Sequence, residues 1–125
     1  MAIRRTTITV TGASGGSGTA TANAISKEPI SGVILGVHLK YTDSPPVGTT
    51  DVTVAEANND PAMPILTITN GATDGWYQPM AGAEDPTGAA YTSAVQQIAV
   101  SDYVKVTIAH ANDNDGVIAT IVWVE

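Results

Sequence analysis

Alternation of apolar and polar residues is the feature that most constrains the fold of this chain. In residues 33–41 every second position is Val, Leu or Tyr, and residues 104–110 repeat the pattern with Val and Ile. A period of two places these side chains on one face of a half-buried β-strand. The segment Val117–Val124 is instead an almost unbroken apolar, β-branched run, which predicts a strand buried on both faces.

Weaker runs of the same kind occupy other parts of the chain. They lie in residues 52–55, 65–69, 3–10 and 18–26, and turn residues separate them at intervals of about 8–12 residues. No window of about 12 residues shows a clean helical period, and residues 89–100 are the best candidate for a helical turn.

Length and strand pattern together predict the architecture. A chain of 125 residues is long enough for one domain with its own core. We therefore predict a single all-β domain over residues 1–125, a β-sandwich or jelly roll of about seven to nine short strands. The core should contain residues 33–41, 104–110 and Val117–Val124. Residues 70–90 are rich in Gly, Pro and Asp, and form a long excursion of the kind that contacts a partner.

Charge and cysteine content exclude several classes of function. Five Lys and Arg against twelve Asp and Glu give a net charge of −7, so we expect neither a nucleic-acid nor a membrane partner. The absence of Cys excludes disulfides, zinc–thiolate sites and cysteine nucleophiles. No apolar run approaches the roughly 18 residues of a transmembrane helix, and no apolar segment of a secretory signal follows the N-terminal arginines.

The segment Thr11–Gly18 carries the glycine pattern of short-chain dehydrogenases, in which a strand leads through a glycine turn into a helix that binds pyrophosphate. Its context differs, because residues 19–31 alternate Thr with Ala and contain Pro29, which makes a poor helix. No Tyr-x-x-x-Lys pair and no βαβ alternation follow. We interpret the segment as a flexible loop or hinge, and a small nucleotide-dependent enzyme remains an alternative.

Other polar groups predict no catalytic or cofactor site. The loop around Asp113 and Asp115 lacks the flanking acids of an EF-hand, so a solvated turn is expected, with a structural calcium site as an open alternative. His38 and His110 could bind a metal only if neighbouring strands aligned them with a carboxylate. We predict no enzymatic activity, no cofactor and no metal requirement.

Trp76 and Tyr77 are adjacent aromatic residues in an extended segment, so their side chains should point to opposite faces. We expect one of them in the core and the other at the surface or an interface, where it could stack on a sugar or a protein partner.

The order of segments along the chain suggests a relationship. A Thr-rich first strand and a Gly/Ser/Thr/Ala spacer precede the strand at residues 30–41 and a Ser-Pro-Pro turn. β-Branched segments follow at residues 50–54, 65–70, 73–77 and 102–108 before a closing strand. Nearly the whole chain thereby resembles small structural proteins of tailed bacteriophages, and most of all capsid decoration, or cement, proteins.

The resemblance implies a non-enzymatic protein that binds the outside of the assembled head shell and stabilises it. Its expected partners are the major capsid protein and itself, as a homotrimer. Its expected location is the virion surface, after synthesis in the bacterial host cytoplasm. The family has no catalytic residues to carry over. A tail, fibre or surface module that binds glycan or protein through Trp76 and Tyr77 remains the alternative.

The N-terminus has the only basic pair of the chain, Arg4 and Arg5. Because few large apolar residues accompany it and the glycine-rich stretch follows, we predict that residues 2–7 extend as an arm from a hinge within residues 1–18. Such an arm could add a strand to a neighbouring subunit, with the arginines pairing to carboxylates. The predicted interface residues are thus Arg4, Arg5, Trp76 and Tyr77.

Overall fold

The computed structural model describes residues 2–43, 46–71 and 73–125. It is all-β, with 61% of the chain in strands and no helix, which confirms the predicted fold class. The described residues form eleven strands rather than seven to nine. The strands are β1 Ile3–Val10, β2 Ala20–Ile25, β3 Ile30–Tyr41, β4 Asp51–Glu56, β5 Pro64–Ile68, β6 Gly75–Tyr77, β7 Met80–Glu84, β8 Ala90–Gln97, β9 Ala99–Asp102, β10 Val104–Ala111 and β11 Val117–Val124.

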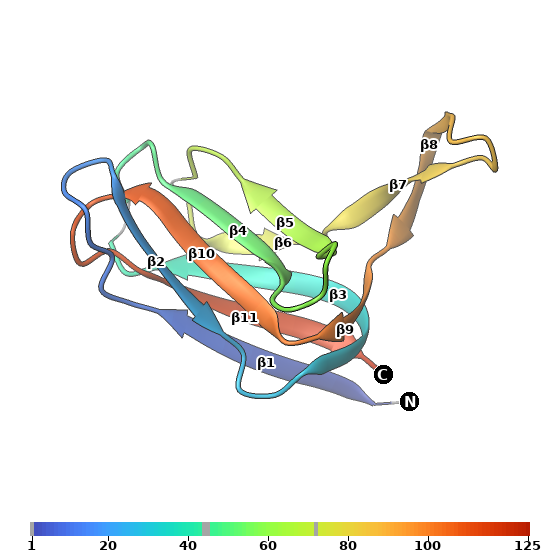
Figure 1. Cartoon of the computed structure of the whole chain (residues 1–125), viewed down its shortest axis with the longest axis horizontal. Helices are drawn as coiled ribbons and strands as arrows, with labels where there is room; N and C mark the ends of the chain where they lie inside the picture. Colours follow the sequence, from blue (N-terminus) through green and yellow to red (C-terminus); the bar gives the residue numbers. More distant parts are fainter. Residues whose placement is uncertain (1, 44–45, 72) are drawn as a thin grey trace.

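Two antiparallel sheets form the body of the molecule (Figure 1). The first, which we call sheet A, has the order β1-β11-β3-β6, and β9 also pairs with β3. The second, sheet C, has the order β2-β10-β4-β5. Strands β7 and β8 pair only with each other, as a hairpin that projects away from the two sheets (Figure 1). The arrangement is compatible with the predicted single-domain sandwich.

The core lies between the sheets and is built from alternate residues of their central strands. Ile108 of β10 and Ile121 of β11 are fully buried, as are Val37 and Leu39 of β3. The three segments predicted to form the core therefore all contribute to it. The prediction that Val117–Val124 is buried on both faces is wrong, because only every second residue is buried and the intervening residues are partly exposed. No other element of the described chain covers that outer face.

The predicted N-terminal arm is wrong, because the segment is a strand of its own sheet. All eight residues of β1 pair with β11, from Ile3 opposite Val124 to Val10 opposite Val117. Ile8 and Val10 point inward and are 2% and 0% exposed. These two side chains supply enough apolar burial to hold an edge strand that otherwise carries Thr and Arg.

Residues 70–100 also differ from the prediction. The expected excursion contains β6 and β7, and the candidate helical turn is replaced by β8 and β9. The strands form because β6 and β9 pair with β3, and because β7 and β8 pair with each other. The weak local preference of these residues does not predict such pairing. Ser44 and Pro45 of the predicted Ser-Pro-Pro turn lie outside the described residues.

Two buried carboxylates join the sheets at one end of the sandwich. Asp102, at the end of β9, is 8% exposed and accepts hydrogen bonds from the backbone N–H groups of Asn58, Asn59 and Tyr103. Glu56, at the end of β4, accepts backbone N–H bonds from Met63 and Ser101 at 2.9 and 3.0 Å. Each carboxylate thereby connects an element of sheet A to a strand or loop of sheet C.

These contacts make the fold sensitive to acid. Burial opposes ionisation of Asp102, but the N–H donors outweigh it and lower the pKa of Asp102. The hydrogen bond from Ser101, followed by that from Met63, lowers the pKa of Glu56. A carboxyl group whose folded pKa lies below its unfolded value stabilises the fold above the unfolded pKa of about 4, and this contribution is lost as the pH falls through the folded pKa.

We predict that Asp102→Asn lowers the melting temperature at neutral pH, because the amide keeps one acceptor oxygen and loses the charge. The difference from wild type should shrink as the pH falls towards about 3, where wild-type Asp102 also becomes protonated. Thermal unfolding followed by circular dichroism across this range measures it, with the exposed Glu28→Gln as control. A difference that stays constant with pH would contradict the assignment.

Gly116 is required where the loop before β11 passes β1. A Cβ atom on Gly116 would overlap the backbone carbonyl oxygen of Val10, whereas one on Gly48 would have no atom within 4 Å. We predict that Gly116→Ala destabilises the protein by about 1–3 kcal/mol, as overpacking against backbone does, and that Gly48→Ala has little effect. Urea unfolding of the two variants measures this, and equal stabilities would refute the close packing of β1 on this loop.

Candidate protein-binding site

The glycine segment that resembles a nucleotide-binding turn connects β1 to β2 and leads into a strand, as the Thr/Ala alternation predicts. Gly12, Gly15, Gly16 and Gly18 all adopt positive φ angles, a conformation that glycine adopts at low cost. The Asp113 side chain accepts hydrogen bonds from the N–H groups of Gly15 and Gly16 at 3.1 and 3.0 Å. The donors that could bind a phosphate are therefore occupied by a carboxylate of the same chain.

The same contacts change the interpretation of the segment as a hinge. The Asn112 side chain accepts hydrogen bonds from Gly18 N–H and from the Ser17 hydroxyl, and Ala13 N–H donates to the carbonyl of Asp115. Ala13 itself is 2% exposed. The glycine segment is thus bound along its length to the turn between β10 and β11, so the predicted hinge is wrong.

Asp113 and Asp115, the candidate calcium ligands, serve different partners. Asp115 is 3% exposed and accepts a hydrogen bond from Asn112 N–H at 3.0 Å. A side-chain hydrogen bond with Asp115 also raises the pKa of Asp43. Within the described residues, no group of three or more His, Asp or Glu side chains converges in a way that could hold a metal ion.

The histidines lie in different sheets. His38 packs edge-on against Trp76 in sheet A, whereas the Nδ1 atom of His110 lies 2.7 Å from Asp51 Oδ2 in sheet C. The Asn70 N–H donor, followed by His110, lowers the pKa of Asp51. The fold therefore does not bring the two imidazoles to one metal site.

We predict that Asp113→Ala loosens the glycine segment while Asp113→Asn largely preserves it, since the amide oxygen can still accept from Gly15 and Gly16. Amide hydrogen exchange at these two glycines should accelerate in the Ala variant and stay near the wild-type rate in the Asn variant. Equal exchange rates in all three proteins would show that Asp113 does not hold this segment.

The outer face of sheet A presents a different chemistry. Register places Arg5, Val122 and Gly36 side by side across β1, β11 and β3, and Trp76 of β6 lies opposite His38. We use the term outer patch for the residues that surround the Trp76 indole at one end of this outward face. Its members are Ile3, Arg5, Val33, Leu35, Gly36, Trp76, Val122 and Val124.

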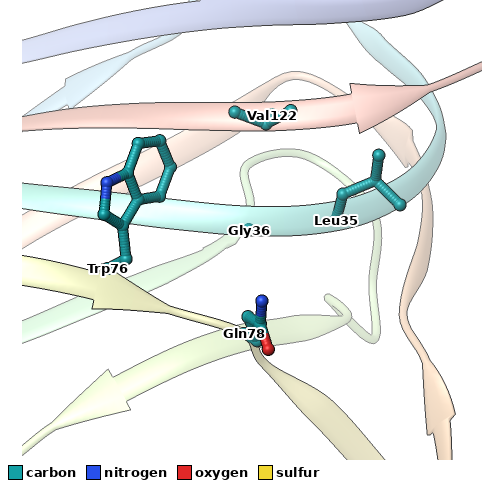
Figure 2. Close-up of a pocket in the computed structure, with 5 residues that line it drawn as sticks. All are labelled: Leu35, Gly36, Trp76, Gln78 and Val122. Carbon is teal, nitrogen blue, oxygen red and sulfur yellow. The ribbon is translucent and has the colours of Figure 1, made fainter.

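Trp76 is the centre of the outer patch, and it is 56% exposed. Its indole crosses β3 towards β11, where Gly36 has no side chain to obstruct it (Figure 2). The nearest indole atom lies 3.7 Å from the position that a Cβ of Gly36 would take. The Arg5 guanidinium lies 5.8 Å from the ring centroid and the His38 ring 5.0 Å from it, so the indole is held between cationic and aromatic neighbours.

A hollow of about 190 Å³ adjoins the indole, lined by Leu35, Gly36, Trp76, Gln78 and Val122 (Figure 2). Apart from the Gln78 amide, its side chains are aliphatic or aromatic. An apolar hollow beside an exposed Trp and an Arg has the composition of a protein-binding hot spot.

The opposite side of the molecule lacks this character. At the centre of sheet C the outward residues Asn23, Thr107 and Thr53 pair across β2, β10 and β4. The next outward residue of β10 is Lys105, which lies between Ala55 and the exposed Ile25. A polar outer face needs no partner, whereas a contiguous apolar one marks an interaction surface. The two outer faces of the sandwich therefore differ in apolar character.

The four predicted interface residues divide between three places. Arg5 and Trp76 meet in the outer patch. Arg4 forms an ion pair with Glu125 and lies over Trp123 at 5.9 Å. Tyr77 faces inward and packs against the core, so the prediction that the two aromatics point to opposite faces is confirmed.

The sequence reasoning missed Leu35, Gly36 and Val122. The almost unbroken apolar run Val117–Val124 predicted a covered second face. Leu35 was expected on the inward face beside Val37, but the irregular pairing opposite Val122 turns it to the outer hollow. The sequence does not specify that, among the described residues, no further strand packs on the outer face of β11.

Comparison of the chain with family models, with curated proteins and with solved structures gives no match. The described residues include no helix that is both long and apolar enough to cross a membrane.

Proposed function

We propose that this chain is a non-enzymatic structural protein of a phage head, which binds the outside of the assembled capsid shell and stabilises it. The observation that carries the binding role is the outer patch, where Trp76 and Arg5 lie over an apolar sheet face. The capsid setting is supported by the resemblance of the segment order to decoration proteins. The major capsid protein and further copies of this chain are the partners, on the virion surface.

The architecture suits such a role. Antiparallel sheets with a β-branched core form a rigid support, and a rigid binding surface loses little conformational entropy when it docks. Many copies on one shell would act together, so that modest affinity at each contact still gives a stable coat. The occupied glycine amides favour a binding role over a nucleotide-dependent enzyme.

A glycan-binding tail, fibre or surface module is the second candidate. The exposed indole beside a hollow is the geometry on which a sugar ring could stack. Of the two aromatic residues predicted to bind, Trp76 offers this, whereas Tyr77 packs against the core. The cationic neighbour Arg5 and the aliphatic lining of the hollow favour a protein partner over a neutral sugar.

We predict that Trp76→Ala weakens binding to purified shells that lack this protein by about tenfold or more, as loss of a central hot-spot aromatic does. Its melting temperature should change little, because the side chain is mainly exposed. Tyr103→Ala, which removes an aromatic that is 38% exposed away from the patch, is the matched control. Co-sedimentation with the shells measures the binding.

Copy number and ligand screening separate the two candidates. Mass spectrometry of purified virions should find this chain in an amount comparable to the major capsid protein. Absence from the head, or a number typical of a fibre, would overturn the capsid role. Retained shell binding by Trp76→Ala, together with loss of binding to an oligosaccharide array, would favour the glycan module.

A further inference from the structure

The β7–β8 hairpin, which we call the projecting hairpin, has no core of its own. Its strands pair only with each other, and Figure 1 shows them directed away from both sheets. Met80, Tyr91 and Val95 are 48%, 54% and 57% exposed. An isolated two-stranded hairpin is marginally stable in water, so a surface that covered these apolar side chains would stabilise this one.

Register indicates which side of the hairpin binds. Gly82 lies opposite Val95 and Met80 opposite Gln97, and residues two apart share a face. Met80 and Val95 therefore point the same way, and Gly82 leaves the Val95 side chain without a cross-strand neighbour. The hairpin presents these two apolar groups to whatever covers it.

The acidic charge of the hairpin indicates what kind of surface could cover it. Residues 80–97 contain Glu84 and Asp85 and no Lys, Arg or His. Hydrogen bonds from the Thr87 hydroxyl, and then from the Ala89 and Thr87 N–H groups, lower the pKa of Asp85 and keep it ionised. Two such hairpins would repel each other, which disfavours pairing of hairpin with hairpin.

The outer face of sheet A, which includes the outer patch, has the complementary charge. Arg5 and Lys40 lie at outward positions of β1 and β3, and among the described residues neither forms an ion pair. The outward positions of β1, β3 and β11 contain no Asp or Glu. The apolar groups of the hairpin thus have an apolar patch to cover, and the exposed carboxylate of Glu84 has cations to meet.

The dimensions also agree. The five residues of β7 span about 17 Å at about 3.4 Å per residue. Three strand spacings of about 4.8 Å separate β1 from β6, which gives a face about 14 Å wide. The hairpin is therefore long enough to cross the patch. It projects away from the sheets of its own chain, so the face that it reaches belongs to another molecule (Figure 1).

We propose that the projecting hairpin of one copy lies across the outer patch of a second copy, with Met80 and Val95 against Trp76 and Val122. Hairpin and patch are different surfaces, so the contact between two copies is head to tail. The inference rests on the proposed function in that the patch binds protein, and it assigns a further copy of the chain, rather than the capsid protein, to the patch. Trp76→Ala would then weaken shell binding by removing the contact between copies on the shell. The inference is tested on the purified chain without shells, so the two can fail separately.

Cross-linking tests the contact directly, because the chain has no Cys and an engineered thiol is unique. Val95→Cys protein is mixed with Thr120→Cys protein, whose thiol lies on the outward side of β11, and oxidised under mild conditions. The expected product is a mixed disulfide dimer. Thr107→Cys is the matched control, since Thr107 is a half-exposed outward residue at the centre of the opposite sheet and should give no mixed dimer.

Charge exchange provides a second, independent test. Sedimentation of the wild type should show a concentration-dependent oligomer. Arg5→Glu and Glu84→Arg should each weaken association by about fivefold or more, and the double variant should recover most of the loss. Lys105→Glu, on the outer face of sheet C, should leave association unchanged.

The outcomes that overturn the proposal are distinct. A disulfide dimer of Val95→Cys with itself in place of the mixed product would mean that hairpins pair with each other. Equal mixed dimer with Thr107→Cys would mean that the contact is not specific. A wild-type protein that stays monomeric at all concentrations, with no mixed dimer, would refute the contact while leaving shell binding to be judged by its own experiment.

Discussion

Burial of alternate aliphatic side chains between β10 and β11 is the interaction on which the rest of the sandwich depends. One strand is central to each sheet, and Val104, Val106, Ile108, Val117, Ala119 and Ile121 are all fully buried. Each larger aliphatic side chain contributes about 1.5–3 kcal/mol on burial. The first two strands of the chain pair only with these last two, so the N-terminal fifth of the chain acquires its structure from the C-terminus.

Carboxylates stabilise the loops of this protein mainly through backbone N–H groups. Asp102, Glu56, Asp113 and Asp85 each accept two or more such bonds, whereas the described residues contain one Arg–Glu pair and one His–Asp pair. The pattern follows from composition, because twelve acids face only five Lys and Arg. An acid bound to backbone amides needs no cation and fixes a turn at the same time.

The contrast between the two outer faces connects the fold to its proposed role. A sandwich needs only its inner faces to be apolar. Sheet C largely follows that rule, with Asn, Thr and Lys at its outer centre and Ile25 as an exposed apolar residue beside them. Sheet A departs from it with Trp76 and the outward residues of β11. The projecting hairpin departs from it in a complementary way, as an acidic element with apolar groups and no cover. Both features are explained if the projecting hairpin of one copy covers the outer patch of another copy.

The sequence alone determined the fold class, the three core segments and the opposed directions of Trp76 and Tyr77, because a period of two is a local property of an extended chain. The apolar run Val117–Val124 also predicted that a second face of this strand is covered. Only the tertiary structure decided that residues 3–10 are a core strand, that Asp113 occupies the glycine amides and that Arg5 meets Trp76. Each of these depends on residues about 70 or more positions apart, and which of many possible strand registers brings them together is decided by packing of the whole domain.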